Sequence, residues 1–306
     1  MSLQWKGVFP AITTKFTAEG ELDLEGFSAN LKEQLAAGVD GIVLGGSLGE
    51  ASVITTAEKE LLVKTAISLA GNIPVVLNIA ESVTTEAIRQ AKLAAEWGAK
   101  GLMLLPPMRY KADDRETVTY FKAVAAATSL PVMIYNNPVD YKIEVTLDMF
   151  AELAEIPNIQ AVKESSRDVT NVTRMINRFG DRFAILCGVD TIAMEELLLG
   201  ANGWVAGLVC AFPRETVAIY RLTKAGRTEE ATRIYRWFMP LLELDIHPKL
   251  VQYIKLAEAQ AGIGTEFVRA PRLTLVGEER ERILNVINTA LAKRPQLPDY
   301  LSITIN

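Results

Sequence analysis

Eight short runs of β-branched and aliphatic residues recur along this chain, and a stretch with helical periodicity follows each run. Runs of this kind, without polar alternation, are typical of parallel strands buried on both faces of a sheet. One run and the stretch after it span about 30 residues, the length of a strand–helix unit. Eight such units in succession favour a closed (β/α)₈ TIM barrel over an open sheet. The runs are residues 7–13, 41–45, 74–79, 101–105, 131–135, 159–163, 183–187 and 203–207.

The pattern changes after Gly226, where three helical stretches follow at about 228–242, 247–261 and 277–293. We therefore predict an α/β chain with a catalytic barrel over residues 1–225. A C-terminal three-helix extension, residues 226–306, is expected to pack on that barrel. The chain has 306 residues, 49% of them hydrophobic, which is enough to bury one large core.

Composition excludes several classes of protein. Two cysteines, Cys187 and Cys210, and the single histidine, His247, are too few for a disulfide framework or a zinc site. His247 is also expected at a helix start, which disfavours a catalytic triad. The net charge of −5 argues against nucleic acid as a partner, and no apolar run is long enough for a membrane span. The first residues lack a secretory pattern, so we expect a cytoplasmic protein that acts on a small molecule.

Lys163 is the most informative candidate residue, because it ends a strand-like run in phase with Ile159 and Ala161. Active sites of TIM barrels lie at the carboxyl ends of the strands, so its amine is expected in the barrel mouth. Burial there lowers the pKa of an amine and leaves part of it neutral and nucleophilic, as Schiff-base chemistry requires. A lysine that forms a salt bridge with Glu164, or one that simply emerges at the rim, is an equally open interpretation of the pattern.

Other strand ends offer groups that suit the same chemistry. Tyr135 can carry protons to and from a carbinolamine, or it can be a barrel-lining aromatic residue. The glycine-rich segment 45–50 can cradle a carboxylate with its backbone N–H groups, or it is a structural turn. Asp190 can contact a substrate hydroxyl or amine, or it can cap the helix that begins at Thr191.

Three motifs together resemble the dihydrodipicolinate synthase/N-acetylneuraminate lyase family. They are Gly46-Ser47-Leu48-Gly49-Glu50, Tyr135-Asn136-Asn137-Pro138 and Lys163-Glu164-Ser165. The resemblance runs nearly end to end and implies Lys163 as the Schiff-base residue and Tyr135 as the proton shuttle. It also implies carboxylate binding by the amides of Ser47 and Leu48, no cofactor or metal, and a homotetramer built as a dimer of dimers. Further substrate contacts are expected at Gly46, Asn137, Gly188, Asp190, Val205, Arg109 and Tyr110.

The chain departs from the family pattern at three points. Leu48 replaces the second hydroxyl of the first motif, which costs little if that position binds through its backbone N–H. Arg109 and then Tyr110 stand where relatives place a tyrosine after the fourth strand, so the proton relay to solvent or to a neighbouring subunit is expected to differ. Asp140 aligns with the arginine that dihydrodipicolinate synthases use on the aspartate semialdehyde carboxylate, which counts against that activity.

Four segments, residues 106–113, 203–207, 251–256 and 267–272, resemble one subfamily, the 1-pyrroline-4-hydroxy-2-carboxylate deaminases. This resemblance implies conversion of that cyclic imine to 2,5-dioxopentanoate and ammonia in hydroxyproline breakdown. Two alternatives stay open: a pyruvate-dependent aldolase, acting on a 2-keto-3-deoxy sugar acid or like dihydrodipicolinate synthase, and a non-catalytic binding protein on the same fold.

We predict that Lys163 forms a covalent imine with a 2-oxo acid. Borohydride added with pyruvate should attach the substrate mass to the peptide that contains Lys163 and should abolish activity, as mass spectrometry and a turnover assay will show. Label on another residue, or full activity of the Lys163→Ala variant, would contradict this prediction.

Overall fold

The computed structural model describes residues 3–107 and 110–305 and contains one sheet of eight parallel strands. Its neighbour order is β1-β8-β7-β6-β5-β4-β3-β2. The ring closes where a bridge between Ala11 and Val43 joins the first two strands. The strands are β1 (Gly7–Pro10), β2 (Ile42–Leu44), β3 (Val75–Ile79), β4 (Gly101–Leu104), β5 (Val132–Asn136), β6 (Ile159–Glu164), β7 (Ala184–Cys187) and β8 (Gly203–Ala206).

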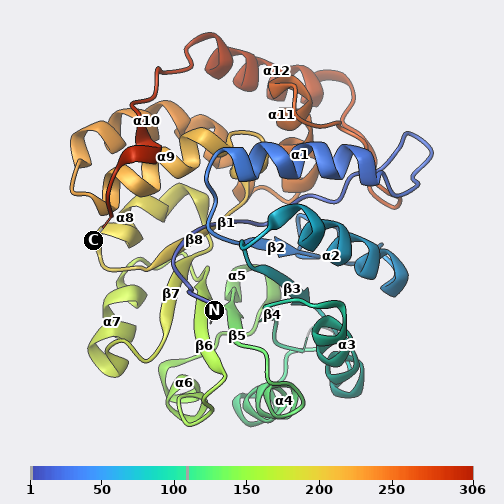
Figure 1. The fold of residues 1–306 in the computed structure, drawn as a ribbon, viewed down its shortest axis with the longest axis vertical. Coiled ribbons are helices and arrows are strands. Elements are labelled where there is room, and N and C mark those ends of the chain that lie inside the picture. Colours follow the sequence, from blue (N-terminus) through green and yellow to red (C-terminus); the bar gives the residue numbers. More distant parts are fainter. Residues whose placement is uncertain (1–2, 108–109, 306) are drawn as a thin grey trace.

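Helices surround the strands, and those of the C-terminal extension lie together on one side of the ring (Figure 1). The TIM barrel and the three C-terminal helices predicted from the sequence are therefore confirmed. The α-helices are α1 (Leu24–Ala36), α2 (Thr56–Ala70), α3 (Thr84–Trp97), α4 (Asp114–Ala126), α5 (Pro138–Tyr141), α6 (Leu147–Leu153), α7 (Thr170–Phe179), α8 (Ala193–Leu198), α9 (Pro213–Lys224), α10 (Thr228–Leu242), α11 (Leu250–Ala261) and α12 (Gly277–Ala292). Four 3₁₀ turns are η1 (Asp190–Ile192), η2 (Leu208–Cys210), η3 (Glu243–Ile246) and η4 (Tyr300–Ser302).

One helix start differs from the sequence-based expectation. His247 does not begin a helix, because residues 243–246 form η3 and α11 starts only at Leu250. The ring of His247 instead accepts a hydrogen bond from the backbone N–H of Lys249, at 3.1 Å. The connection between α10 and α11 is therefore a compact turn.

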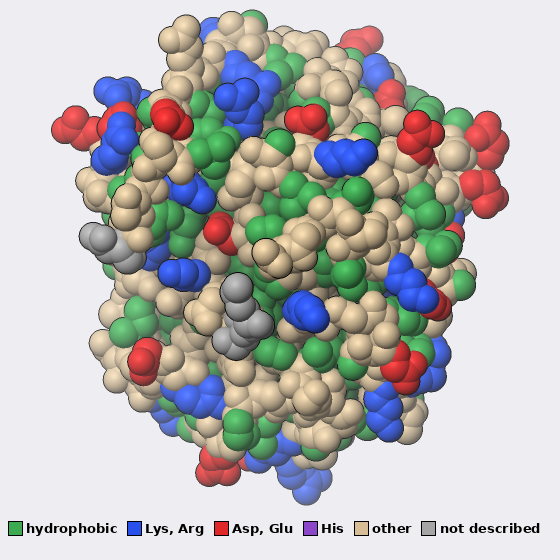
Figure 2. Space-filling view, in the orientation of Figure 1, with side chains coloured by type: hydrophobic (Ala, Val, Ile, Leu, Met, Phe, Trp, Pro, Cys, Tyr) green, Lys and Arg blue, Asp and Glu red, His purple; other side chains and the backbone are tan. Residues whose placement is uncertain are grey.

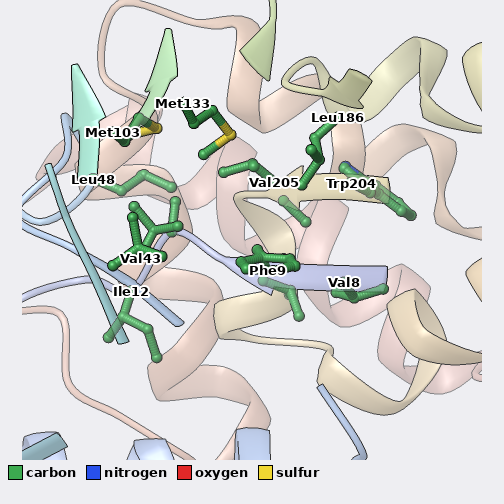
Figure 3. Packing of buried hydrophobic residues seen from close by; sticks show 14 of the residues in the cluster. Val8, Phe9, Ile12, Val43, Leu48, Met103, Met133, Leu186, Trp204 and Val205 are labelled. Carbon is green, nitrogen blue, oxygen red and sulfur yellow. The ribbon is translucent and has the colours of Figure 1, made fainter. Parts of the chain in front are cut away.

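The barrel interior is a packed core. Figure 3 shows side chains from different strands pointing toward one another, and all of them are buried. Filling of this kind is general in TIM barrels, where the interior is no pore. Room for a ligand is therefore expected at the ends of the strands. The labelled residues include Phe9, Val43, Met103, Met133, Leu186 and Val205.

Buried ion pairs fasten the C-terminal extension to the barrel. Lys255 on α11 donates to Glu50 in the turn after β2, at 2.5 Å, and both side chains are fully buried. A second buried pair joins Lys15, which follows β1, to Glu258 on α11 at 2.5 Å. Removing one partner of such a pair leaves an uncompensated charge and is strongly destabilising. The extension and the turn after β2 thus form one structural unit.

The surface shows no concentration of one charge sign on the face seen in Figure 2, where acidic and basic side chains are interspersed. A nucleic-acid footprint would need a basic patch, and this face has none. Within residues 3–107 and 110–305, no helix combines the length and apolar character that crossing a membrane requires.

Glu196 on α8 is fully buried, and burial raises its pKa to about 8. The folded state therefore holds a proton that the unfolded state releases near pH 4.5. The stabilising contribution of this proton is complete below pH 4.5 and is lost as the pH rises toward 8. Replacement by glutamine removes that dependence.

We predict that the free energy of unfolding of Glu196→Gln rises relative to that of the wild type as the pH increases from about 4.5 to 8, by roughly 3–5 kcal/mol in total. Urea unfolding at several pH values measures the difference, with the exposed neighbour Glu195→Gln as the control. If the free energies of unfolding of the wild type and Glu196→Gln changed in parallel with pH, Glu196 would be ionised in the folded state and the prediction would be wrong.

Candidate active site

A cavity of about 60 Å³ opens at the carboxyl ends of the strands, and Lys163 lies in it. This volume suits a metabolite of a few heavy atoms, or the reacting end of a longer one. Contributions come from several strand ends and from the C-terminal extension. The lining residues are Ala11, Gly46, Ser47, Leu48, Met103, Tyr135, Asn137, Asp140, Lys163, Ser165, Arg167, Gly188, Val189, Val205, Gly207, Asp245, Ile246 and Leu250.

The Lys163 amine is buried without an ion-pair partner. Its residue is 7% exposed, and no carboxylate among the described residues lies within 4.0 Å of Nζ. Burial lowers its pKa, and the charge of Asp245 is the largest influence that raises it again. The neutral fraction of this amine is therefore higher than that of an exposed lysine, and the neutral form is the one that acts as a nucleophile.

Glu164, the alternative partner of Lys163, lies on the other face of β6. Its carboxylate accepts hydrogen bonds from Asn136 Nδ2 at 3.1 Å, Asn171 Nδ2 at 2.7 Å and the Ser166 backbone N–H at 2.7 Å. Successive side chains of a strand point to opposite faces, so Lys163 points inward when Glu164 points outward. The interpretation of Lys163 as a rim lysine paired with Glu164 is therefore wrong.

Tyr135 on β5 stands directly beside Lys163 in the register of the two strands. The Lys163 Nζ lies 4.1 Å from the centre of the Tyr135 ring. Asn137 Nδ2 donates to the Tyr135 hydroxyl at 3.1 Å. Burial raises the pKa of this phenol far above its usual value, so the hydroxyl stays protonated and acts as a donor.

Tyr141, at the end of α5, links Tyr135 to the turn after β2. Its ring packs edge-on against Tyr135 with centroids 5.6 Å apart, and its hydroxyl lies 2.5 Å from Ser47 Oγ. Burial raises the pKa of Tyr141 to about 12. The three hydroxyl groups thus come from β5, from α5 and from the turn after β2, and two of them, those of Ser47 and Tyr135, belong to residues that line the cavity with Lys163.

The turn after β2 contributes Gly46, Ser47 and Leu48 to the wall of the cavity. Gly45 has a φ of +67° and Glu50 one of +53°, so two left-handed residues bound the turn. Within the described part of the chain, no group accepts a hydrogen bond from the N–H of Ser47 or Leu48. Free amides in such a turn form an anion-binding concavity. The buried pair of Glu50 with Lys255 holds the turn in place.

The loop and strand ends around β7 have structural roles. A Cβ atom on Gly188 would lie 2.6 Å from Lys163 Cε, so glycine is needed for the lysine side chain to pass. Asp190 is buried and accepts hydrogen bonds from Trp204 Nε1 at 2.8 Å and from the backbone N–H of Leu208 at 2.7 Å. It therefore joins β7 to β8, and it caps no helix, which corrects the expectation of a cap before Thr191.

The remaining predicted contacts divide into three groups. Gly46, Leu48 and Val205 line the cavity, as does Asn137, whose amide nitrogen already donates to Tyr135 and Asp140. Tyr110 is 56% exposed and does not line the cavity. The expected place of Tyr110 next to the substrate is thus not found in this single chain, and Arg109 lies outside the described residues.

Sequence reasoning missed two polar residues that line the cavity, Asp245 and Arg167, and it also missed Tyr141, which contacts Tyr135 and Ser47 next to the cavity. None of them ends a strand, the position from which the other site residues were predicted. In the structure Arg167 has a φ of +65°, which is rare for a residue other than glycine, and such backbone strain often marks functional sites. Asp245 lies in a part of the chain whose pattern indicated only helices.

Comparisons with known proteins agree with this geometry. The sequence profile of the dihydrodipicolinate synthetase family matches residues 4–290. The chain is 35% identical over 289 residues to a 4-hydroxy-tetrahydrodipicolinate synthase of Exiguobacterium sibiricum, covering 93% of this chain and 97% of that protein. It is 31% identical to a protein of the same name from Methanothrix thermoacetophila, over 92% of this chain and 96% of the other.

Solved structures give the same result. The dihydrodipicolinate synthase of Bacillus anthracis superposes with a TM-score of 0.89 at 27% identity, covering 94% of this chain and 99% of that one. The dihydrodipicolinate synthase of Aquifex aeolicus gives 0.88 at 28% identity, over 93% and 97% of the two chains. Fold, site geometry and sequence therefore lead to one conclusion: the chain belongs to the dihydrodipicolinate synthetase family.

Proposed function

We propose that the chain is a lyase that forms a Schiff base between Lys163 and the C2 carbon of a 2-oxo acid. The observation that carries the proposal is the buried Lys163 amine, which faces a small cavity and has no ion-pair partner among the residues described. An amine in such a place is nucleophilic, and an imine to it draws electrons from the neighbouring carbon.

The surrounding groups suit each step of imine formation. The nitrogen of Lys163 bonds to C2, and the carbonyl oxygen takes up a proton to give a carbinolamine. Tyr135 keeps its proton and lies next to the amine, so it can donate to this oxygen as it leaves as water. The free amides of Ser47 and Leu48 can hold the substrate carboxylate. The resulting iminium ion makes the protons on C3 acidic.

For the finer assignment, we propose pyruvate as the 2-oxo acid and an aldehyde as the second reactant, joined through C3. The relatives with 31–35% identity are named 4-hydroxy-tetrahydrodipicolinate synthase, and the chain spans nearly their whole length. Arg167 lines the cavity and has no ion-pair partner among the residues described. Its guanidinium is thus available to a carboxylate on the aldehyde, although Asp140 stands where the resemblance places an arginine.

A second candidate is the deamination of 1-pyrroline-4-hydroxy-2-carboxylate. The observation that favours it is Asp140, whose carboxylate lines the cavity and repels a second anionic group there. Transimination by Lys163 would open the ring and leave an amine on C5, and loss of the C3 proton and the C4 hydroxyl would release water and form a C3–C4 double bond. Tautomerisation, in which C5 loses a proton and the conjugated chain gains one, would move the double bond to the C5–nitrogen bond. Hydrolysis of this imine at C5 would release ammonia, and hydrolysis at Lys163 would release 2,5-dioxopentanoate. The proposal also includes the homotetramer and the cytoplasmic location expected above.

We predict that the purified protein consumes pyruvate when aspartate semialdehyde is added and releases no ammonia from the pyrroline. Lactate dehydrogenase can follow the pyruvate, and glutamate dehydrogenase the ammonia. Ammonia together with an aldehyde oxidisable to 2-oxoglutarate, with pyruvate unchanged, would favour the second candidate. The Lys163→Ala variant is the control, because either reaction should stop without this amine.

We predict that Tyr135→Phe keeps the fold and lowers kcat roughly 10²-fold or more, the usual loss for a positioned proton donor. The aromatic packing against Tyr141 survives the change, so the thermal unfolding temperature should stay near that of the wild type. A kcat close to that of the wild type would mean that water or another group carries this proton.

A further inference from the structure

Asp245 brings a carboxylate from the C-terminal extension into the mouth of the barrel. It lies in η3, between α10 and α11, and lines the cavity together with Lys163. Ile246 and Leu250 from the same segment also line the cavity. The extension therefore forms part of the wall of the active site.

The approach of Asp245 depends on a glycine at the end of β8. A Cβ atom added to Gly207 would lie 2.3 Å from Asp245 Oδ1, closer than any real contact of that kind. The backbone of Gly207 has a φ of −97°, which any residue adopts, so the conformation does not explain the glycine. The space for the Asp245 carboxylate explains it.

Asp245 is also the carboxylate at the cavity that other side chains leave free. No described side chain donates a hydrogen bond to it or pairs with it. Asp190 is held by Trp204 and the amides after β8, and Asp140 accepts from Asn137 Nδ2 at 2.7 Å. The backbone N–H of Asp190 interacts with the Asp245 carboxylate, but no side-chain donor competes for it, as a base that takes a proton from substrate requires.

We propose that Asp245 is the catalytic base that takes the C3 proton of the substrate bound to Lys163. This inference rests on the proposed function, because it needs the iminium ion at Lys163. It applies to both candidate substrates, because each of them must lose a proton from C3.

In the proposed step the C3–H bond breaks, and the proton goes to a carboxylate oxygen of Asp245. The electron pair of that bond forms the C2–C3 double bond, and the electrons of the C2–N double bond return to nitrogen, which gives a neutral enamine. With pyruvate, the reverse step returns a proton to C3. Because Asp245 is only partly buried, its proton can exchange with solvent between the two steps.

Electrostatics support the assignment. Burial and the charge of Asp190 raise the pKa of Asp245 well above its usual value, while Lys163 lowers it. A carboxylate with a raised pKa is a stronger base than an exposed one. Tyr135 is unsuited to this role, because burial keeps its phenol protonated.

The test measures deuterium exchange into the methyl group of pyruvate by proton NMR in D₂O, together with borohydride trapping at Lys163. The proteins are the wild type, Asp245→Asn and the control Glu243→Gln, an exposed residue of the same turn. We expect Asp245→Asn to be trapped like the wild type, and we expect its rate of deuterium exchange to fall by roughly 10²-fold or more. Glu243→Gln should match the wild type in both measurements.

The outcomes separate this inference from the proposed function. Exchange at the wild-type rate by trapped Asp245→Asn would overturn the role of Asp245 and leave the Schiff base intact. A folded Asp245→Asn that is not trapped would also overturn it, because Asp245 would then act in imine formation. A wild type that is not trapped would refute the proposed function itself.

A second variant covers the case in which Asp245→Asn does not fold. Gly207→Ala leaves the carboxylate in the chain but displaces it, since the added Cβ collides with Oδ1. Trapping should persist while exchange slows at least 10-fold. Unchanged exchange in a folded, trapped Gly207→Ala would overturn the inference.

Discussion

Closure of the strand ring is the constraint on which the rest of this structure depends. Pairing of β1 with β8, in the register Gly7 to Gly203 through Pro10 to Ala206, together with the bridge from Ala11 to Val43, turns eight parallel strands into a barrel with one carboxyl end. All strand ends then converge on one opening, and the packed interior below it excludes water (Figure 3). A side chain that ends a strand and points inward therefore lies at the bottom of this opening. Lys163 is that side chain.

The buried lysines of the chain show what distinguishes the one at the site. Lys15, Lys59 and Lys255 each pair with a carboxylate, at 2.5, 3.3 and 2.5 Å. Lys163 is buried to the same degree as Lys59 and has no such partner in the described part of the chain. An ammonium ion in that position is costly, so the neutral amine is favoured. The charges of the first three lysines are neutralised by carboxylates, whereas the amine of the fourth is left free for the chemistry proposed above.

The C-terminal extension has two physical roles. Its buried pair of Lys255 with Glu50 holds the glycine-rich turn that lines the cavity, and its pair of Glu258 with Lys15 holds the segment after β1. Its short turn η3 places Asp245 against Gly207, in the cavity that Lys163 also lines. Both roles depend on the same packing of α11 against the barrel. The shape of the cavity and the charges that line it therefore depend on the position of the extension.

Sequence by itself determined the repeated strand–helix units, the three C-terminal helices, and Lys163 and Tyr135 as inward-pointing residues on neighbouring strands. These follow from periodicity, which is a local property that a chain carries before it folds. It did not determine that Lys163 lacks an ion-pair partner among the described residues, how Asp190 is used in the structure, that Asp245 and Arg167 line the cavity, or that Tyr141 contacts Tyr135 and Ser47. Those depend on which distant segments meet when the ring closes and the extension docks, and on side-chain directions in irregular turns without periodicity. Only the tertiary structure could decide them, because the energies of burial and of charge that set their roles arise from contacts between residues far apart in the chain.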